Sequence, residues 1–153
     1  MKQCVQCGGK KFVATQVPVS RLLAGATFTA QVAGRRCAAC GAQYAGQAAL
    51  EEFDRRVARA VAAAGVATGE ALRFMRKVVG VSAKEFADLL GVTPETLSRW
   101  EHGRRGMDPT ALRILRAATL DECEGRTTTL DELRATQATT RLGKRVAFGK
   151  IVA

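Results

Sequence analysis

The sequence predicts a mainly α-helical protein with a small β-structured metal domain at its N-terminus. Hydrophobic residues make up 47% of the chain but aromatic residues only 5%, and much of the apolar content is alanine, which favours helices over strands. Two Cys-x-x-Cys pairs occur before Gly41, and a series of short, capped helical segments follows further along the chain. We therefore expect an N-terminal four-cysteine zinc domain followed by a five-helix domain.

The charge of the chain is unevenly distributed. The net charge is +10, and residues 1–50 contain six Lys or Arg and no Asp or Glu. From Glu51 onward, eighteen basic and fourteen acidic residues alternate as on an ordinary protein surface. The overall charge favours an anionic partner such as double-stranded DNA. The change in composition indicates a domain boundary near residue 50.

Three segments are expected along the chain. Residues 1–66 form a zinc ribbon with a connecting helix, residues 67–122 a helix-turn-helix domain, and residues 123–153 a basic C-terminal extension. The sequence has neither an apolar signal segment nor a stretch long enough to cross a bilayer, so we expect a cytoplasmic protein with no membrane partner. In that compartment cysteine pairs are more often metal ligands than disulfides.

The four cysteines have the spacing of a zinc ribbon. Glycines follow each pair and allow the tight turns that direct two sulfurs at one point. Four thiolates in a tetrahedron suit one structural Zn²⁺ and leave no open position for catalysis, so we expect no enzyme. Iron bound as in rubredoxin-like carriers and thiol redox chemistry are the alternatives. The predicted ligands are Cys4, Cys7, Cys37 and Cys40.

The residues between the cysteine pairs have strand character. Polar and apolar residues are interleaved over Lys11–Thr15 and Thr27–Val32, with turns expected at Val17–Val19 and Gly25. A connecting helix is predicted over Gln47–Ala64, with its apolar residues spaced by three and four. We expect this helix to pack on the ribbon and to be followed by a hinge at residues 65–69.

The middle of the chain has the pattern of a helix-turn-helix unit. A first helix over Ala71–Val79 ends at Gly80, and a capping box at residues 82–85 begins a second helix that buries Phe86, Ala87 and Leu90. After a turn at Gly91, Thr93 caps a third helix that runs to Glu101. Asp108 and Pro109 begin a further helix that includes Leu120, and a short helix is expected over Leu130–Ala135.

The third helix has the composition of a DNA recognition helix. Leu97 and Trp100 should face the core, which leaves the opposite side free to meet base edges. Arg99 is the predicted reader of guanine, because its guanidinium can bond O6 and N7 together. Glu95, Thr96 and Ser98 are also assigned to base edges, and the other predicted contacts are assigned to phosphates. The full set of predicted DNA contacts is Ser82, Lys84, Thr93, Glu95, Thr96, Ser98, Arg99, Arg104 and Arg105.

The segment SAKEFADLLGVTPETLSRWEHGRR resembles the Xre/Cro-type helix-turn-helix, including its Ser-x-Trp-Glu-x-Gly ending. Together with the upstream cysteine ribbon, residues 1–120 resemble the MqsA-type antitoxins, in which a YgiT-type zinc finger precedes an Xre-type domain. The resemblance implies that the ribbon contacts a partner toxin and that the C-terminal half dimerises on a palindrome. It places the family's recognition arginine on Arg99, and Glu95 where the family has asparagine.

We therefore expect an autoregulating repressor that acts as a homodimer on a palindromic operator, as the antitoxin of a type II toxin–antitoxin pair. A stand-alone regulator with no toxin is the alternative, because the ribbon lacks the acidic residues expected to mask a basic ribonuclease. An iron or thiol redox protein is the third hypothesis. In the extension, Arg141–Lys150 is basic and Arg145–Val152 has strand character.

Overall fold

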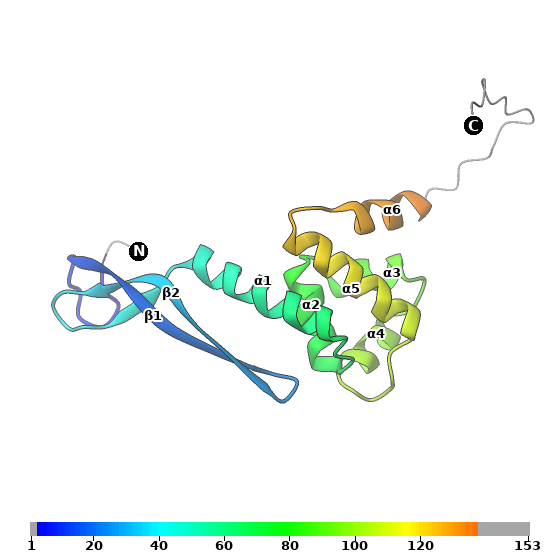
Figure 1. Cartoon of the computed structure of the whole chain (residues 1–153), viewed down its shortest axis with the longest axis horizontal. Helices are drawn as coiled ribbons and strands as arrows, with labels where there is room; N and C mark the ends of the chain where they lie inside the picture. Colours follow the sequence, from blue (N-terminus) through cyan, green and yellow to red (C-terminus); the bar gives the residue numbers. More distant parts are fainter. Residues whose placement is uncertain (1–2, 138–153) are drawn as a thin grey trace, which may run out of the picture.

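The computed structural model describes residues 3–137. The sheet consists of β1 (Phe12–Leu23), β2 (Ala26–Cys37) and β3 (Gln43–Ala45), in the order β1-β2-β3. Six helices follow, so within the described residues the chain is mainly helical with a small N-terminal sheet, as predicted (Figure 1). They are α1 (Gln47–Ala64), α2 (Gly69–Val78), α3 (Ala83–Leu89), α4 (Pro94–Glu101), α5 (Pro109–Cys123) and α6 (Thr128–Gln137).

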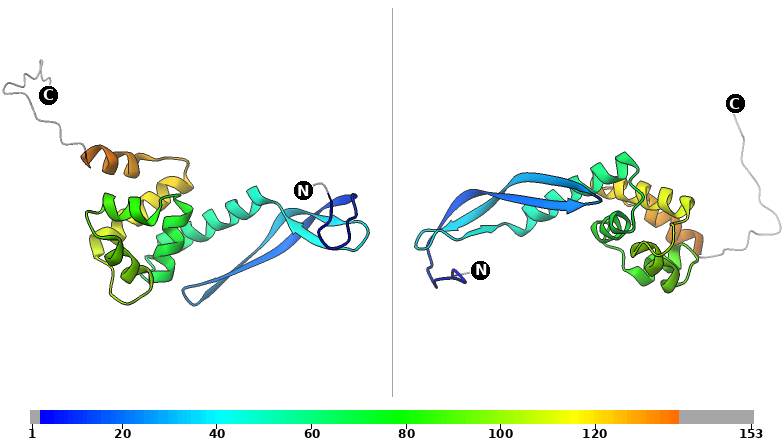
Figure 2. Two further views of the ribbon diagram at one scale, coloured as in Figure 1. Left: turned by 180° about the vertical axis from the view of Figure 1, so that it is seen from behind. Right: turned by 90° about the horizontal axis from the view of Figure 1, so that it is seen from below.

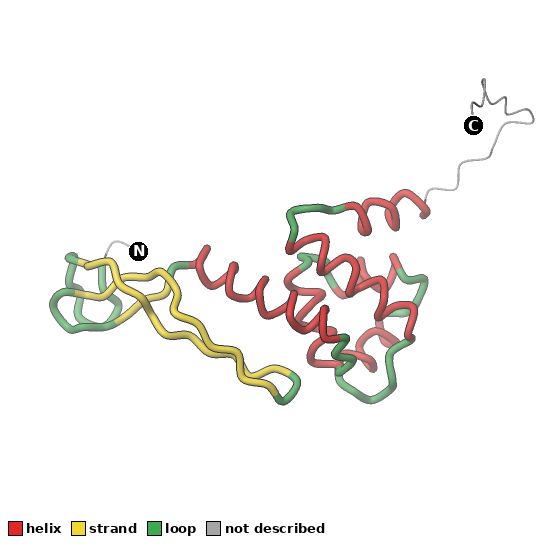
Figure 3. The backbone as a smooth tube through the Cα atoms, viewed as in Figure 1, coloured by secondary structure: helices red, strands yellow, loops and turns green. Residues whose placement is uncertain are grey.

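Strands β1 and β2 form one long antiparallel hairpin, which extends as an arm beside the helices (Figure 3). Each strand has twelve residues, so both are longer than predicted. The turn expected around Pro18 is wrong, because Pro18 pairs with Gln31 in the middle of the hairpin. Since β1 is an edge strand, the amide that proline lacks is not needed by a neighbour.

The two faces of the hairpin differ in burial. Val17 and Val32 are cross-strand partners on one face, and both are buried in the apolar cluster. The neighbouring pair Pro18 and Gln31 lies on the other face and is exposed. The alternation of strand side chains therefore gives the hairpin one apolar face, which packs toward the helices.

Helix α1 has the predicted bounds, Gln47–Ala64, and contacts both β2 and the helical bundle. Its buried residues include Val57 and Val61, and the helix packs against α2 and α5. Arg116 of α5 donates from Nε to the carbonyl oxygen of Ala62 at 2.7 Å, which satisfies an acceptor in the last turn of α1. The predicted hinge at residues 65–69 coincides with the short connection between α1 and α2: Gly65 ends α1 with φ 69°, and Gly69 is the first residue of α2. Its role as a hinge stays a prediction.

The helix starts follow the predicted caps. Ser82, Thr93 and Asp108 each accept a hydrogen bond from a backbone amide in the first turn of α3, α4 and α5. Helix α2 begins earlier than predicted, because Thr68 caps it through the amide of Ala71 at 3.2 Å. Leu90 is only half-buried, unlike Phe86 and Ala87, because it lies at the end of α3 beside the turn.

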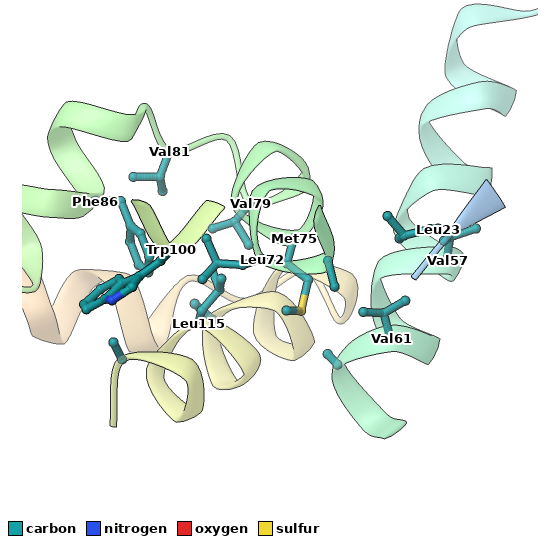
Figure 4. Packing of buried hydrophobic residues seen from close by; sticks show 14 of the residues in the cluster. Leu23, Val57, Val61, Leu72, Met75, Val79, Val81, Phe86, Trp100 and Leu115 are labelled. Carbon is teal, nitrogen blue, oxygen red and sulfur yellow. The ribbon is translucent and has the colours of Figure 1, made fainter. Parts of the chain in front are cut away.

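One apolar cluster runs through the described part of the molecule. Figure 4 shows Leu23 of the hairpin near Val57 of α1, and Leu72 and Met75 of α2 near Leu115 of α5. Helix α6 folds back over α5 and contacts α3, and Figure 2 shows the same arrangement from two further sides. This cluster includes residues from all three predicted segments, 1–66, 67–122 and 123–153, so the core does not divide at their boundaries. The division into three domains stays a proposal.

None of the helices within residues 3–137 is both long and apolar enough to span a membrane. The basic segment and strand expected at Arg141–Lys150 and Arg145–Val152 lie outside the described residues.

Candidate metal centre and nucleic-acid interface

The two cysteine pairs lie on turns with the same hydrogen-bonding pattern. The amide of Cys4 donates to the carbonyl of Gly9, and the amide of Gly8 donates to the carbonyl of Cys4, both at 2.8 Å. The amide of Cys37 donates in the same way to Ala42, and that of Gly41 to Cys37. Gly8 and Gly41 have φ values of 71° and 76°, a region that glycine occupies without strain. Each turn therefore directs both of its sulfurs to the same side.

The four sulfurs meet at one point. All four Sγ atoms lie within 4.8 Å of one another, and the Cys4–Cys40 and Cys7–Cys37 distances are both 3.6 Å. Zinc–sulfur bonds of about 2.3 Å in a tetrahedron require sulfurs roughly 3.8 Å apart, so the cluster fits Zn²⁺. A Cβ on Gly9 would lie 3.2 Å from the Cys7 sulfur, which explains the absence of a side chain there. The four cysteines form a single structural zinc site, as predicted.

Tyr44 supports the site from β3. Its hydroxyl lies 3.1 Å from the Sγ of Cys4, within reach to donate to that sulfur when Cys4 is a thiolate. This hydrogen bond is the main cause that lowers the pKa of Cys4 to about 6. For Cys7 the Gly9 amide acts to lower the pKa, but hydrogen bonds that the Cys7 thiol donates to the Cys40 and Cys37 sulfurs, together with burial, raise the pKa to about 12. The pKa of Cys37 is lowered as well, mainly by the backbone amides of Cys40 and Ala39, so hydrogen bonds at both cysteine turns favour the thiolate form that binds zinc.

Tyr44→Phe is expected to weaken zinc binding roughly tenfold, because removal of the hydroxyl leaves the Cys4 thiolate with one fewer donor. The ring's edge-on contact with Phe12, at 6.1 Å between centroids, is retained in the variant. Competition with a chelator of known affinity measures the change. An unchanged zinc dissociation constant would show that the hydroxyl has no part in metal binding.

Helix α4 separates a buried side from an exposed one. Leu97 and Trp100 are buried in the core, as predicted, while Glu95, Ser98 and Arg99 are exposed. Thr96 is half-buried. The indole Nε1 of Trp100 is buried and has no hydrogen-bond partner among residues 3–137.

The other predicted DNA contacts lie at the starts of α3 and α4 and in the loop after α4. Ser82 and Thr93 are exposed caps at the N-termini of α3 and α4, and the Thr93 hydroxyl also lies 3.1 Å from the hydroxyl of Thr96. Within the described part of the chain, no carboxylate lies within ion-pairing distance of the four exposed cations Lys84, Arg99, Arg104 and Arg105. This surface therefore presents positive charge that is not neutralised internally.

A buried ion pair fixes the end of α4 to α2. Arg76 Nε donates to Glu101 Oε1 at 2.6 Å, and the exposed fractions of the two side chains are 8% and 6%. Arg76 also donates from Nη1 to the carbonyl of Val81 at 2.8 Å, just before the cap of α3. One guanidinium therefore orients both helices of the helix-turn-helix relative to α2.

Two residues of these sites, Arg76 and Tyr44, were not among the predicted site residues. Arg76 occupies the same apolar stripe as Leu72, Met75 and Val79, so an arginine at a core position was the available signal. Its partner Glu101 was noted only as part of the family motif. Nothing in the sequence pairs Tyr44 with Cys4, because the contact depends on β3 folding back beside β2.

The geometry defines a class of protein: a zinc ribbon joined to a helix-turn-helix unit. A family model described as "Antitoxin component of bacterial toxin-antitoxin system, MqsA" matches residues 1–134. The chain belongs to this MqsA antitoxin family, which confirms the predicted resemblance. No curated protein matches the chain.

Proposed function

We propose that this antitoxin represses transcription by binding a palindromic DNA operator as a homodimer. The observation that carries the proposal is the surface of α4, where Arg99 is exposed and has no carboxylate partner among the described residues, while Leu97 and Trp100 anchor the helix. An exposed helix of this kind at the second position of a helix-turn-helix is suited to the major groove.

The proposed contacts divide into two kinds. Glu95, Thr96, Ser98 and Arg99 meet base edges, where Arg99 bonds guanine and Glu95 accepts from a cytosine amino group. The phosphate contacts come from the caps and the flanking cations, which position the protein without reading sequence. These are Ser82, Lys84, Thr93, Arg104 and Arg105.

A homodimer follows from the size of the recognition surface. One short helix such as α4, with eight residues, contacts too few base pairs to select a single site in a genome. Two copies related by a two-fold axis read two half-sites about one helical turn apart, so we propose a palindromic operator. We infer no catalytic role for the metal, since four thiolates complete its tetrahedron.

Arg99→Ala is expected to weaken operator binding by about 1–3 kcal/mol and to relax the preference at the base pair that it reads. The operator is first obtained by selecting bound sequences from a random DNA pool, and affinities are then measured by fluorescence anisotropy. Arg105→Ala serves as the matched control, because it removes the same charge from the proposed phosphate contacts. It should weaken binding to all sequences alike and flatten the salt dependence. Wild-type affinity and selectivity in Arg99→Ala would refute the assignment.

Membership of the antitoxin family favours a toxin partner bound through the ribbon. The ribbon's charge favours the alternative, a regulator without a toxin: residues 1–50 have no acidic residue to oppose a basic ribonuclease. Co-purification with the product of the adjacent gene separates these candidates. A homodimer that purifies alone and binds DNA would support the stand-alone regulator.

A further inference from the structure

The tip of the β1–β2 hairpin is held far from the metal site. Strand β3 pairs only with residues 34–36 of β2, so the rest of the hairpin is two-stranded. At about 3.3 Å per residue, twelve-residue strands place the tip roughly 35 Å from the ends near the cysteines. An isolated two-stranded hairpin is marginally stable in water. Contacts other than those to zinc must therefore hold this end.

The tip is bound to two helices. Arg21 donates from Nε and Nη2 to the two carboxylate oxygens of Asp54 in α1, at 2.9 and 3.0 Å. Its guanidinium carbon lies 4.9 Å from the centre of the Phe74 ring in α2. Leu23 is 3% exposed, and the amide of Ala24 donates to Glu70 of α2 at 3.1 Å. We call residues 21–24 the tip clamp.

The backbone at the tip adopts an unfavourable conformation that the contacts of the tip clamp hold in place. Ala24 is the only non-glycine residue with a positive φ, 51°, within the described residues. It precedes Gly25, with φ 78°, in a two-residue turn that joins strands of matching twist. The left-handed backbone conformation is unfavourable for alanine. In this conformation the amide of Ala24 donates to Glu70, and its side chain packs against the apolar cluster.

Helix α2 connects the tip clamp to the recognition helix α4. A Cβ on Gly69, at the start of α2, would lie 2.3 Å from the carbonyl oxygen of Trp100, so the two helices approach closely there. Further along α2, Arg76 forms the buried pair with Glu101. The same helix is therefore fixed to the hairpin on one side and to α4 on the other.

We propose that the tip clamp makes the stability of α2 and α4 depend on zinc bound at the other end of the hairpin. A metal that binds only the folded state stabilises every element that unfolds together with its site. The zinc fixes the base of the hairpin, and the tip clamp extends that cooperative unit into the helical bundle. The coupling is reciprocal, so the clamp also strengthens zinc binding. The proposal concerns the folded chain alone and does not rest on DNA binding.

The test is amide hydrogen exchange of the full chain, with one zinc bound and after its removal with EDTA. In the wild type, metal removal should lower the protection of α2 and α4 amides by about tenfold or more. In Arg21→Ala the ribbon amides should still lose protection, whereas α2 and α4 should change by less than about twofold. Arg21→Lys keeps the charge but loses the bidentate hydrogen bond to Asp54. It should also reduce the effect of zinc on the protection of α2 and α4.

Arg113→Ala is the matched control, because it removes an exposed arginine from α5 and leaves the tip clamp intact. It should respond to metal removal as the wild type does. Two results would overturn the proposal: α2 and α4 protection that is independent of zinc in the wild type, or an equal response in the Arg21 variants. The second would show that the coupling runs through the direct chain connection from β3 to α1, where Gly46 precedes the first residue of α1. If Arg21→Ala does not retain zinc, Arg21→Lys decides between these outcomes.

Discussion

Cys37→Ser is expected to abolish zinc binding and to unfold the ribbon. Cys37 is fully buried, and its amide and carbonyl both take part in the second cysteine turn. The hairpin buries few large side chains of its own, mainly Val17, Leu23 and Val32. Zinc bound to sites of this kind contributes on the order of 10 kcal/mol to folding, so its loss outweighs what the small core supplies.

Elemental analysis and the amide NMR spectrum measure this effect. The wild type should be colourless and contain one zinc per chain, whereas Cys37→Ser should contain none and lose the dispersed signals of residues 12–37. Cys123→Ser is the control, since that thiol donates to the carbonyl of Arg55 and lies outside the cluster. It should keep its zinc. Full zinc content in Cys37→Ser, or iron in the wild type, would contradict the assigned site.

The second large effect is expected from Glu101→Ala. This change leaves the Arg76 guanidinium, with an exposed side-chain fraction of 8%, without its carboxylate partner. Breaking a buried pair in this way costs about 3–5 kcal/mol, because a charge is left in the core without compensation. Urea unfolding should show a correspondingly lower midpoint. The end of α4 loses its attachment to α2 at the same time.

Two variants establish the cause of that loss. Glu124→Ala removes a carboxylate from the more exposed pair with Arg126 and should cost less than about 1 kcal/mol. Arg76→Met combined with Glu101→Leu removes both charges, and it should recover most of the stability lost in Glu101→Ala. A Glu101→Ala protein with wild-type stability would show that water or another group solvates Arg76.

Much of the helical architecture could be predicted because its signals are local. Ser82, Thr93 and Asp108 begin their helices through bonds to amides two or three residues away. The spacing of the cysteine pairs likewise restricts each pair to a tight turn.

The strands were harder to predict, because their length depends on a partner strand. Pro18 indicated a turn, yet it is tolerated in β1 at the edge of the sheet. The length of the hairpin follows from its apolar face, where Val17 and Val32 bury against the helices. Local sequence patterns do not predict that contact, because it joins residues far apart in the chain.

The sequence by itself determined the metal ligands, the starts of α3, α4 and α5, and the exposed face of α4. These depend on residue chemistry and on spacings of a few positions. Only the tertiary structure decided that Arg76 meets Glu101, that Tyr44 meets Cys4, and that the hairpin tip docks on α1 and α2. The partners in these contacts are 25 to 46 positions apart. Such pairs form only when the packing of whole elements brings them together.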